Sequence, residues 1–288
     1  MRLGLLVLLA FVAGCGGEQR AAPDQAATPS PTPAASATPA PAPDAALPAA
    51  PGALASDLAR TRAALWPAID RWRAEGDPGR NGIPEDVAAL AQREQRIYRR
   101  LGRDRRLSRR VLAALPSALR AEARDNVVAR LELERIVSKH VGPPPKVAIG
   151  PAQPADVLRS HYRRAQRRFG TGAPLLAAVN FVESAFGRLR NRSVSGARGP
   201  MQFMPATWAA YGLGGDISDP RDAILGAANY LHANGAPGSE TRALLRYNPS
   251  SDYVTAVSRY ARRIRADWRA FYAYYAWVIH YRGKHIKP

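Results

Sequence analysis

Apolar residues recur at helical spacing through the first half of the chain, beginning near residue 53. Between residues 54 and 72 one helical face carries Leu54, Leu58, Thr61, Leu65, Ile69 and Trp72. A second run opens after Pro84, a short apolar pattern covers residues 107–115, and a fourth covers residues 118–140. A period close to 3.6 residues is typical of amphipathic helices. The pattern therefore predicts a small helical region over residues 53–142.

The second half repeats this pattern after a stretch rich in proline and glycine at residues 143–154. Such a stretch is typical of a boundary between folded units. Helical spacing or helix-start signals then mark six segments, at residues 154–169, 175–186, 205–211, 220–231, 239–246 and 252–264. Strand patterns are nearly absent. We expect an all-α protein whose second unit covers residues 150–288 and whose fragment from Pro154 onward folds without the first unit.

The N-terminus has the three zones of an export signal: Arg2, an apolar run, and small residues that end at Cys15. The apolar run is too short to span a bilayer. Residues 12–15 resemble a lipobox, which implies cleavage before Cys15 and lipidation of its sulfur. Residues 16–52 are Ala, Pro, Thr and Ser with almost no large apolar side chain, and we expect a disordered tether. The alternative is an ordinary signal peptide that leaves a soluble secreted protein.

The formal net charge of +19 indicates a polyanionic neighbourhood. The chain lacks helix-turn-helix, zinc and base-stacking signatures, so we exclude nucleic acid as a partner. Anionic wall polymers and lipid headgroups fit an exported protein better. Part of the charge is concentrated in one cluster, namely Arg93, Arg96, Arg99, Arg100, Arg103, Arg105, Arg106, Arg109 and Arg110. We interpret most of this cluster as a solvated face, with docking to an anionic surface as the alternative.

One acidic residue lies on an apolar helical face. Rotation of about 100° per residue places Glu183 on the same side as Leu176, Val179 and Phe186. A carboxyl group in such a setting is poorly solvated, so its pKa should rise toward the range that a general acid needs. The alternative is a buried ion pair between Glu183 and Arg188 or Arg190.

A glycine-bearing loop follows this helix at residues 196–202. The missing Cβ atoms of Gly196 and Gly199 would let backbone groups approach a bulky sugar closely, and Gln202 adds an amide side chain. The alternative is an ordinary surface turn.

Four ordered motifs resemble those of the lytic transglycosylases. They are Glu183-Ser184, the run from Gly196 to Pro205, the run from Ala227 to Leu231, and Tyr247-Asn248. The resemblance covers about residues 154–264 and implies a lysozyme-like helical domain with a groove for a glycan strand. The chain departs from the commoner second motif in having Pro200 before Met201, which leaves the subfamily open.

Carried over to this chain, the resemblance makes Glu183 the catalytic residue. It would protonate the glycosidic oxygen between N-acetylmuramic acid and N-acetylglucosamine and then act as a base, so that the 6-hydroxyl closes a 1,6-anhydro ring. Ser184 and Tyr247 are expected to orient Glu183 through hydrogen bonds. The residues implied to contact substrate are Ser184, Gly196, Gly199, Met201, Gln202, Asn229, Tyr230, Tyr247 and Asn248.

Two other functions remain open, a lysozyme-type hydrolase and a non-catalytic lipoprotein that binds peptidoglycan. A hydrolase needs a second carboxylate about 5 to 9.5 Å away. The acids downstream are Asp216, Asp219, Asp222, Glu240 and Asp252, and none is singled out by its context. We interpret Asp219 and Asp222 as helix-capping residues.

We expect no cofactor and no metal. The five histidines lack zinc spacing, and residues 212–217 are too few and too poor in oxygen ligands for a calcium loop. Aromatic side chains cover most of a C-terminal helix, at Trp268, Phe271, Tyr272, Tyr274, Tyr275 and Trp277. Packing against the catalytic domain is the favoured interpretation of this helix, with a sugar-stacking platform as the alternative.

Overall fold

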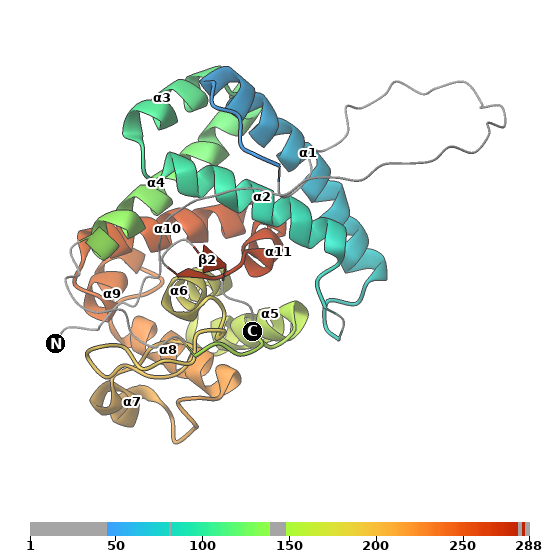
Figure 1. Ribbon diagram of the computed structural model, residues 1–288. Coiled ribbons are helices and arrows are strands. Elements are labelled where there is room, and N and C mark those ends of the chain that lie inside the picture. Colours follow the sequence, from blue (N-terminus) through green and yellow to red (C-terminus); the bar gives the residue numbers. More distant parts are fainter. Residues whose placement is uncertain (1–44, 81, 139–147, 282–283, 286–288) are drawn as a thin grey trace.

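The computed structural model describes residues 45–80, 82–138, 148–281 and 284–285. Over these residues the protein is all-helical, as predicted, except for one antiparallel ribbon of two short strands (Figure 1). The elements in chain order are α1 (Pro51–Glu75), α2 (Glu85–Leu101), α3 (Arg105–Ala114), α4 (Ser117–Ser138), α5 (Ala155–Phe169), α6 (Ala173–Ser184), α7 (Pro205–Tyr211), α8 (Pro220–Ala233), α9 (Glu240–Tyr247), α10 (Ser251–Ala266), α11 (Arg269–Ala276), β1 (His280–Tyr281) and β2 (Lys284–His285).

The helix ends follow local sequence signals. Asp104 caps α3 and Asp219 caps α8, each with its carboxylate accepting from a backbone N–H of the first turn. Prolines occupy the first turns of α6, α7 and α8, where the missing N–H costs nothing. Gly170 ends α5 in the left-handed conformation. The capping role predicted for Asp219 is confirmed, whereas Asp222 instead accepts a hydrogen bond from the backbone N–H of Asp216.

The helices form two groups with α10 and α11 between them. In Figure 1, α1 to α4 lie at one end of the molecule and α5 to α9 at the other. Helix α10 packs against α4 on one side and against α6 on the other, and α11 packs against α1, α2 and α6. The buried apolar side chains form one continuous cluster from Leu54 in α1 to Trp277 after α11. The two groups therefore share a core.

Polar contacts cross the same junction. The carboxylate of Asp125 in α4 is 4% exposed and accepts hydrogen bonds from the guanidiniums of Arg259 and Arg262 in α10. The side chain of Gln95 in α2 both donates to and accepts from the backbone of Val278, at 2.7 and 3.0 Å. This packing argues against independent folding of the fragment from Pro154 onward, because that fragment would expose apolar surface and leave these partners unpaired.

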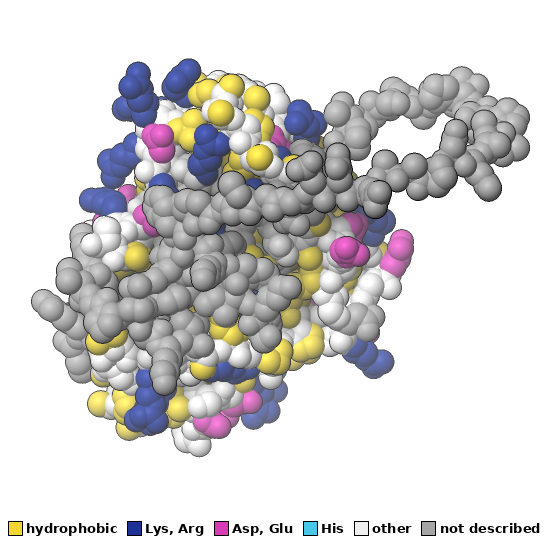
Figure 2. Space-filling view, viewed as in Figure 1, with side chains coloured by type: hydrophobic (Ala, Val, Ile, Leu, Met, Phe, Trp, Pro, Cys, Tyr) yellow, Lys and Arg dark blue, Asp and Glu magenta, His cyan; other side chains and the backbone are white. Residues whose placement is uncertain are grey.

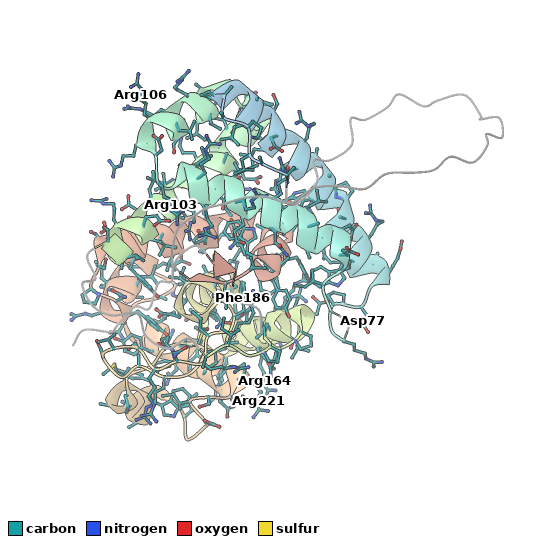
Figure 3. The ribbon with its side chains drawn as sticks, viewed as in Figure 1. Asp77, Arg103, Arg106, Arg164, Phe186 and Arg221 are labelled. Atoms are coloured by element: carbon teal, nitrogen blue, oxygen red, sulfur yellow. The ribbon has the colours of Figure 1, made fainter. Side chains whose placement is uncertain are left out.

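The arginine cluster has two parts with different roles. Three arginines of α2 hold the chain segment ahead of α1: Arg93 and Arg96 donate to the carbonyl of Ala45, and Arg100 donates to the carbonyl of Pro48. Arg93 is 2% exposed and also pairs with the buried Asp57. The prediction of a solvated face is thus wrong for Arg93 and Arg99, which are buried. It is confirmed for the exposed arginines around α3, of which Figure 3 labels Arg103 and Arg106.

These contacts also bear on the predicted boundary at residue 52. Residues 45–50 are held by α2, and α1 begins at Pro51, so the prediction of a disordered tether is wrong for residues 45–52. The export signal, Cys15 and the tether up to residue 44 lie outside the described residues. Among the helices that the structure does describe, none combines the length and the apolar character needed to cross a bilayer.

The C-terminal aromatic residues pack inside the molecule, which confirms the favoured interpretation. Phe271, Tyr274 and Trp277 are each at most 3% exposed. The ring of Tyr274 stacks on Phe181 of α6 with 5.3 Å between centroids. Phe271, Tyr274 and Trp277 thus serve as core, whereas Trp268 and Tyr275 are only partly buried.

Candidate active site

Helix α6 runs through the middle of the second group and carries Glu183 in its last turn. Its apolar residues Leu176 and Val179 are fully buried, and the helix packs against α5, α8 and α10. The helix ends at Ser184 because Ala185 and Phe186 adopt positive φ angles of 50° and 65°. Phe186 continues the buried face in the interior of the molecule, as its position in Figure 3 shows. Glu183 is 3% exposed, so the predicted orientation toward the core is confirmed.

The carboxyl group of Glu183 has one protein partner and one open oxygen. The hydroxyl of Tyr253, in α10, donates to Oε1 at 2.7 Å. The Oε2 atom forms no hydrogen bond with a described residue and is not fully buried. Burial raises the pKa of Glu183 from 4.5 to about 8, and the hydrogen bond from Tyr253 opposes part of that rise. The group is therefore a neutral acid at pH 7 with one oxygen accessible to a ligand.

The alternative interpretation, an ion pair between Glu183 and Arg188 or Arg190, is wrong. The Arg188 guanidinium donates to the carbonyls of Ala185, Tyr275 and Trp277. The Arg190 guanidinium donates to the carbonyl of Pro151. Among the described residues no cation neutralises the Glu183 carboxylate, which is why burial dominates its pKa.

Ser184 points away from Glu183, contrary to our expectation. Its Oγ donates to the carbonyl of Pro200 at 2.5 Å and accepts from the backbone N–H of Gly187 at 2.8 Å. The side-chain amide of Asn180 donates to the same Pro200 carbonyl, and Tyr162 donates to Asn180. Consecutive residues of a helix project about 100° apart, so Ser184 cannot share the direction of Glu183. Ser184 instead ties the end of α6 to the following loop.

The loop that follows is held by its own backbone and by Gln202. Gly199 has φ +73°, and a Cβ there would lie 1.9 Å from the carbonyl oxygen of Ile217. The missing side chain of Gly199 thus makes room for the protein's own backbone. The prediction that it makes room for a sugar is wrong. Gly196 has φ +90° with open space where a Cβ would be, so close approach of a ligand fits there.

Gln202 closes this loop and leaves one acceptor unused. Its amide nitrogen donates to the carbonyls of Gly199 and Asn191 at 3.0 and 3.3 Å. Its Oε1 atom is buried without a hydrogen-bond partner among the described residues. A buried acceptor of this kind carries a desolvation cost unless a ligand or water supplies a donor. Gln202 therefore can bind a hydroxyl or amide group.

Tyrosine rings connect the second, third and fourth motifs. The hydroxyl of Tyr247 donates to the carbonyl of Met201 at 2.6 Å rather than to Glu183. Its ring meets that of Tyr230 edge to face, 5.6 Å between centroids, and Tyr230 meets Tyr211 in the same way at 4.9 Å. Burial and then the nearby Glu183 raise the pKa of Tyr247 well above 10. Tyr247 thus lies near the acid and fixes the loop, and the expectation that it orients Glu183 by a hydrogen bond is wrong.

The remaining predicted contact residues are spread around these rings. Tyr230 is partly exposed, and its hydroxyl donates to the carbonyl of Arg246. The amide of Asn229 donates to the carbonyl of Tyr211 at 3.1 Å, and Asn248 is 6% exposed at the end of α9. Met201 is fully buried, and its carbonyl accepts the hydrogen bond from Tyr247. Their contacts with substrate stay predictions.

The downstream acids are engaged elsewhere. Glu240 pairs with Arg265 at 2.6 Å, and Asp252 lies 3.5 Å from Arg135. Asp216 accepts from the backbone N–H of Ser218. None of these acids contributes to the pKa of Glu183, whose causes are burial and Tyr253. Over the described residues, no group of three or more His, Cys, Asp or Glu side chains could hold a metal ion.

Tyr253 is the partner that sequence reasoning missed. It belongs to the helical pattern of residues 252–264, where an aromatic residue fits a core position equally well. Only the packing of α10 against α6 brings its hydroxyl to Glu183.

Comparison with known proteins places this site in a family. Residues 160–267 match the family model described as the transglycosylase SLT domain. A search of curated proteins and a search of solved structures returned no match. The matched range includes Glu183, the loop after α6, and both tyrosines near the acid. Residues 160–267 therefore match a transglycosylase domain of the lysozyme-like superfamily.

Proposed function

We propose that the protein is a lytic transglycosylase that cleaves the bond between N-acetylmuramic acid and N-acetylglucosamine and leaves 1,6-anhydro ends. The observation that supports this most is the state of Glu183 within the matched SLT region. It is a buried acid whose pKa is about 8, with Tyr253 bonded to one carboxyl oxygen and no described residue bonded to the other. A general acid must hold its proton at the operating pH and release it to the leaving group. Glu183 meets the first condition at pH 7.

Tyr253 supports the second condition. When Glu183 transfers its proton to the glycosidic oxygen, the carboxylate becomes charged in a poorly solvated site. The Tyr253 hydroxyl donates to Oε1 and stabilises that anion. The carboxylate then removes the proton of the sugar's 6-hydroxyl, whose oxygen closes on the anomeric carbon. The proton count returns to its starting value, so one carboxyl group serves both steps without water.

The lysozyme-type alternative requires a second carboxylate on the opposite face of the sugar. No acid contributes to the electrostatics of Glu183 among the described residues, which favours the water-free route. Digestion of purified peptidoglycan followed by mass spectrometry tests the proposal. Product ends should be lighter than hydrolysed ends by one molecule of water. Reducing ends would establish the hydrolase instead, and binding without cleavage would establish the non-catalytic alternative.

Tyr253→Phe should weaken catalysis and move its pH dependence. Loss of the hydroxyl removes the interaction that lowers the pKa of Glu183, so that pKa should rise above its wild-type value of about 8. Activity requires the neutral acid, so the alkaline fall in kcat/KM should move to higher pH while kcat decreases. Rates of muropeptide release from pH 5 to pH 10 check this. Tyr247→Phe is the control, because the hydroxyl of Tyr247 donates to the carbonyl of Met201 and not to Glu183. The alkaline fall in kcat/KM of this variant should stay at the wild-type pH. If the alkaline fall in kcat/KM of Tyr253→Phe stays at the wild-type pH or moves to lower pH, the proposed role of Tyr253 is contradicted.

We further propose that the protein is exported and anchored by lipid on Cys15, with residues 16–44 as the tether. The lipobox-like residues 12–15 support this. Cys15→Ala should shift the protein from the membrane fraction to the soluble fraction, as immunoblotting of fractionated cells would measure. Unchanged membrane association of the variant would contradict lipidation.

A further inference from the structure

An open pocket of about 640 Å³ lies between α5, the start of α6, and the junction of α10 with α11. Its lining includes Arg163, Gln166, Arg167, Pro174, Arg265 and Trp268. Ala173, also at this pocket, begins α6, and Glu183 follows ten residues later in the same helix. At 1.5 Å per residue the pocket is about 15 Å along the helix axis from the catalytic acid. It is therefore separate from the candidate active site.

Two guanidinium groups in this pocket have no counter-charge. Arg163 and Arg167 are exposed, one helical turn apart on α5, and no ion pair or hydrogen bond is recorded for either among the described residues. The neighbouring cations are already occupied. Arg265 pairs with Glu240 at 2.6 Å, and Arg159 lies 3.9 Å from Asp156. The positive charge available to a ligand is therefore that of Arg163 and Arg167.

The charge pattern of α5 favours an anion at this position. Five arginines lie within its fifteen residues, and like charges four positions apart on a helix repel each other. Figure 3 labels another of them, Arg164, close to Arg221 of α8. An anion shared between Arg163 and Arg167 removes this repulsion on the pocket side. A phosphate group suits them best, because each guanidinium offers a planar fork of donors that matches two phosphate oxygens.

The backbone N–H groups at the start of α6 do not form the anion site. The backbone N–H of Ala173, in the first turn of α6, donates to the side chain of Gln166 at 2.7 Å. A ligand would thus be held by side chains rather than by free amides. This makes Arg163 and Arg167 the residues to test.

Trp268 gives the pocket an apolar wall beside the two cations. Its indole is partly buried and is braced by Phe271, edge to face at 5.6 Å between centroids, and by the Arg159 guanidinium at 5.2 Å from its ring centroid. An aromatic surface fixed next to a cationic pair can contact an apolar face of a ligand while the cations bind its charge. A sugar ring has such a face in its C–H groups.

We propose that this pocket binds a phosphorylated saccharide, with the phosphate between Arg163 and Arg167 and the sugar ring against Trp268. The ligand class is independent of the reaction at Glu183. An anionic ligand agrees with the formal net charge of +19, and the pocket is where two of the positive charges would bind it. A phosphate-bearing glycan in the cell envelope would hold the enzyme through a site about 15 Å along α6 from its catalytic acid.

Isothermal titration calorimetry of the full chain tests the proposal with N-acetylglucosamine 6-phosphate as the probe. The wild type should bind this probe more tightly than inorganic phosphate and should not bind unphosphorylated N-acetylglucosamine. The double variant Arg163→Ala and Arg167→Ala should lose at least about tenfold in affinity, since two charge-assisted contacts are removed. Peptidoglycan cleavage by this variant should be unchanged, which shows that it is folded.

The matched control is the double variant Arg105→Ala and Arg109→Ala, which removes the same charge from exposed positions on α3. It should bind the probe as the wild type does. Equal losses in both double variants would overturn the proposal, because bulk charge would then explain binding. Equal affinities for inorganic phosphate and the sugar phosphate would overturn the role of Trp268. Binding to vesicles that contain phosphatidylglycerol is measured last. If vesicle binding depends on Arg163 and Arg167 but binding of the sugar phosphate does not, the pocket is a lipid site and the proposal is wrong.

Discussion

Glu183→Gln is expected to abolish peptidoglycan cleavage while leaving glycan binding largely intact. Glutamine keeps the shape of the side chain and can still accept from Tyr253, but it has no proton to give and none to take. One positioned acid or base contributes about 10²- to 10⁴-fold to a rate, and Glu183 serves in both steps, so a loss of at least about 10³-fold is expected. Release of soluble muropeptides measures the rate, and co-sedimentation with insoluble peptidoglycan measures binding.

The control for this variant is Glu240→Gln, the same chemical change in an acid that pairs with Arg265 and does not contribute to the pKa of Glu183. Its cleavage rate should stay near that of the wild type. Wild-type activity in Glu183→Gln would show that another group is the acid. Equal loss in both variants would show that the effect is not specific to the active site.

The same variant should also change the pH dependence of stability. The Glu183 carboxyl keeps its proton up to about pH 8 when folded but loses it near pH 4.5 when unfolded. The unfolded state therefore binds fewer protons between these values, and the free energy of unfolding falls as the pH rises. Glu183→Gln removes this penalty, so its melting temperature should exceed that of the wild type by more at pH 8 than at pH 5. A difference independent of pH would contradict the raised pKa.

Removal of residues 1–147 is expected to prevent cooperative folding of the remaining chain. The fragment would expose the faces of α10 and α11 that pack on α1, α2 and α4. It would also take away Asp125 from Arg259 and Arg262, and Asn126 from the buried hydroxyl of Tyr274. Since α10 carries Tyr253, loss of its packing should also disorder the active site. Thermal unfolding followed by circular dichroism checks this, and a sharp transition in an active fragment would contradict the shared core.

A single substitution tests the same junction without truncation. Asp125→Ala should lower the free energy of unfolding by about 2 kcal/mol or more, because it leaves two guanidiniums without their buried acceptor. Asp70→Ala is the matched control. Asp70 pairs with Arg269 across the same junction at 3.0 Å, but its side chain is 49% exposed. Such a pair should contribute at most about 1 kcal/mol. Similar losses in both variants would show that burial of Asp125 does not matter.

The helices and the buried acid could be predicted from the sequence because both depend on local periodicity. The face of α1 and the orientation of Glu183 follow from spacing near 3.6 residues alone. The partners of Glu183 could not be predicted, because Tyr253 reaches it only through the packing of α10 on α6. A hydrogen bond between Ser184 and Glu183 is expected because the two residues are adjacent in the first motif. Adjacent helical residues, however, point in different directions.

Long-range contacts also explain the other differences. The sequence pattern predicts solvated arginines on α2, but three of them donate to carbonyls of residues 45–48, about fifty positions earlier in the chain. In Figure 2 the Lys and Arg side chains stand out clearly around the α3 end of the molecule. The sequence predicts that a sugar approaches the backbone at Gly199, whereas the carbonyl of Ile217 occupies the space where a Cβ of residue 199 would be. In each case the sequence shows the residue type but not the partner that the fold brings to it.

Digestion of purified peptidoglycan in water labelled with heavy oxygen tests most directly whether Glu183 completes both steps without water. In the proposed reaction the oxygen that closes on the anomeric carbon comes from the sugar's own 6-hydroxyl. Mass spectrometry of the new muramic acid ends should therefore find anhydro ends that carry no heavy oxygen. New ends that carry one heavy oxygen would mean that water attacked the anomeric carbon, and would contradict the account of Glu183 as the sole acid and base of a lytic transglycosylase.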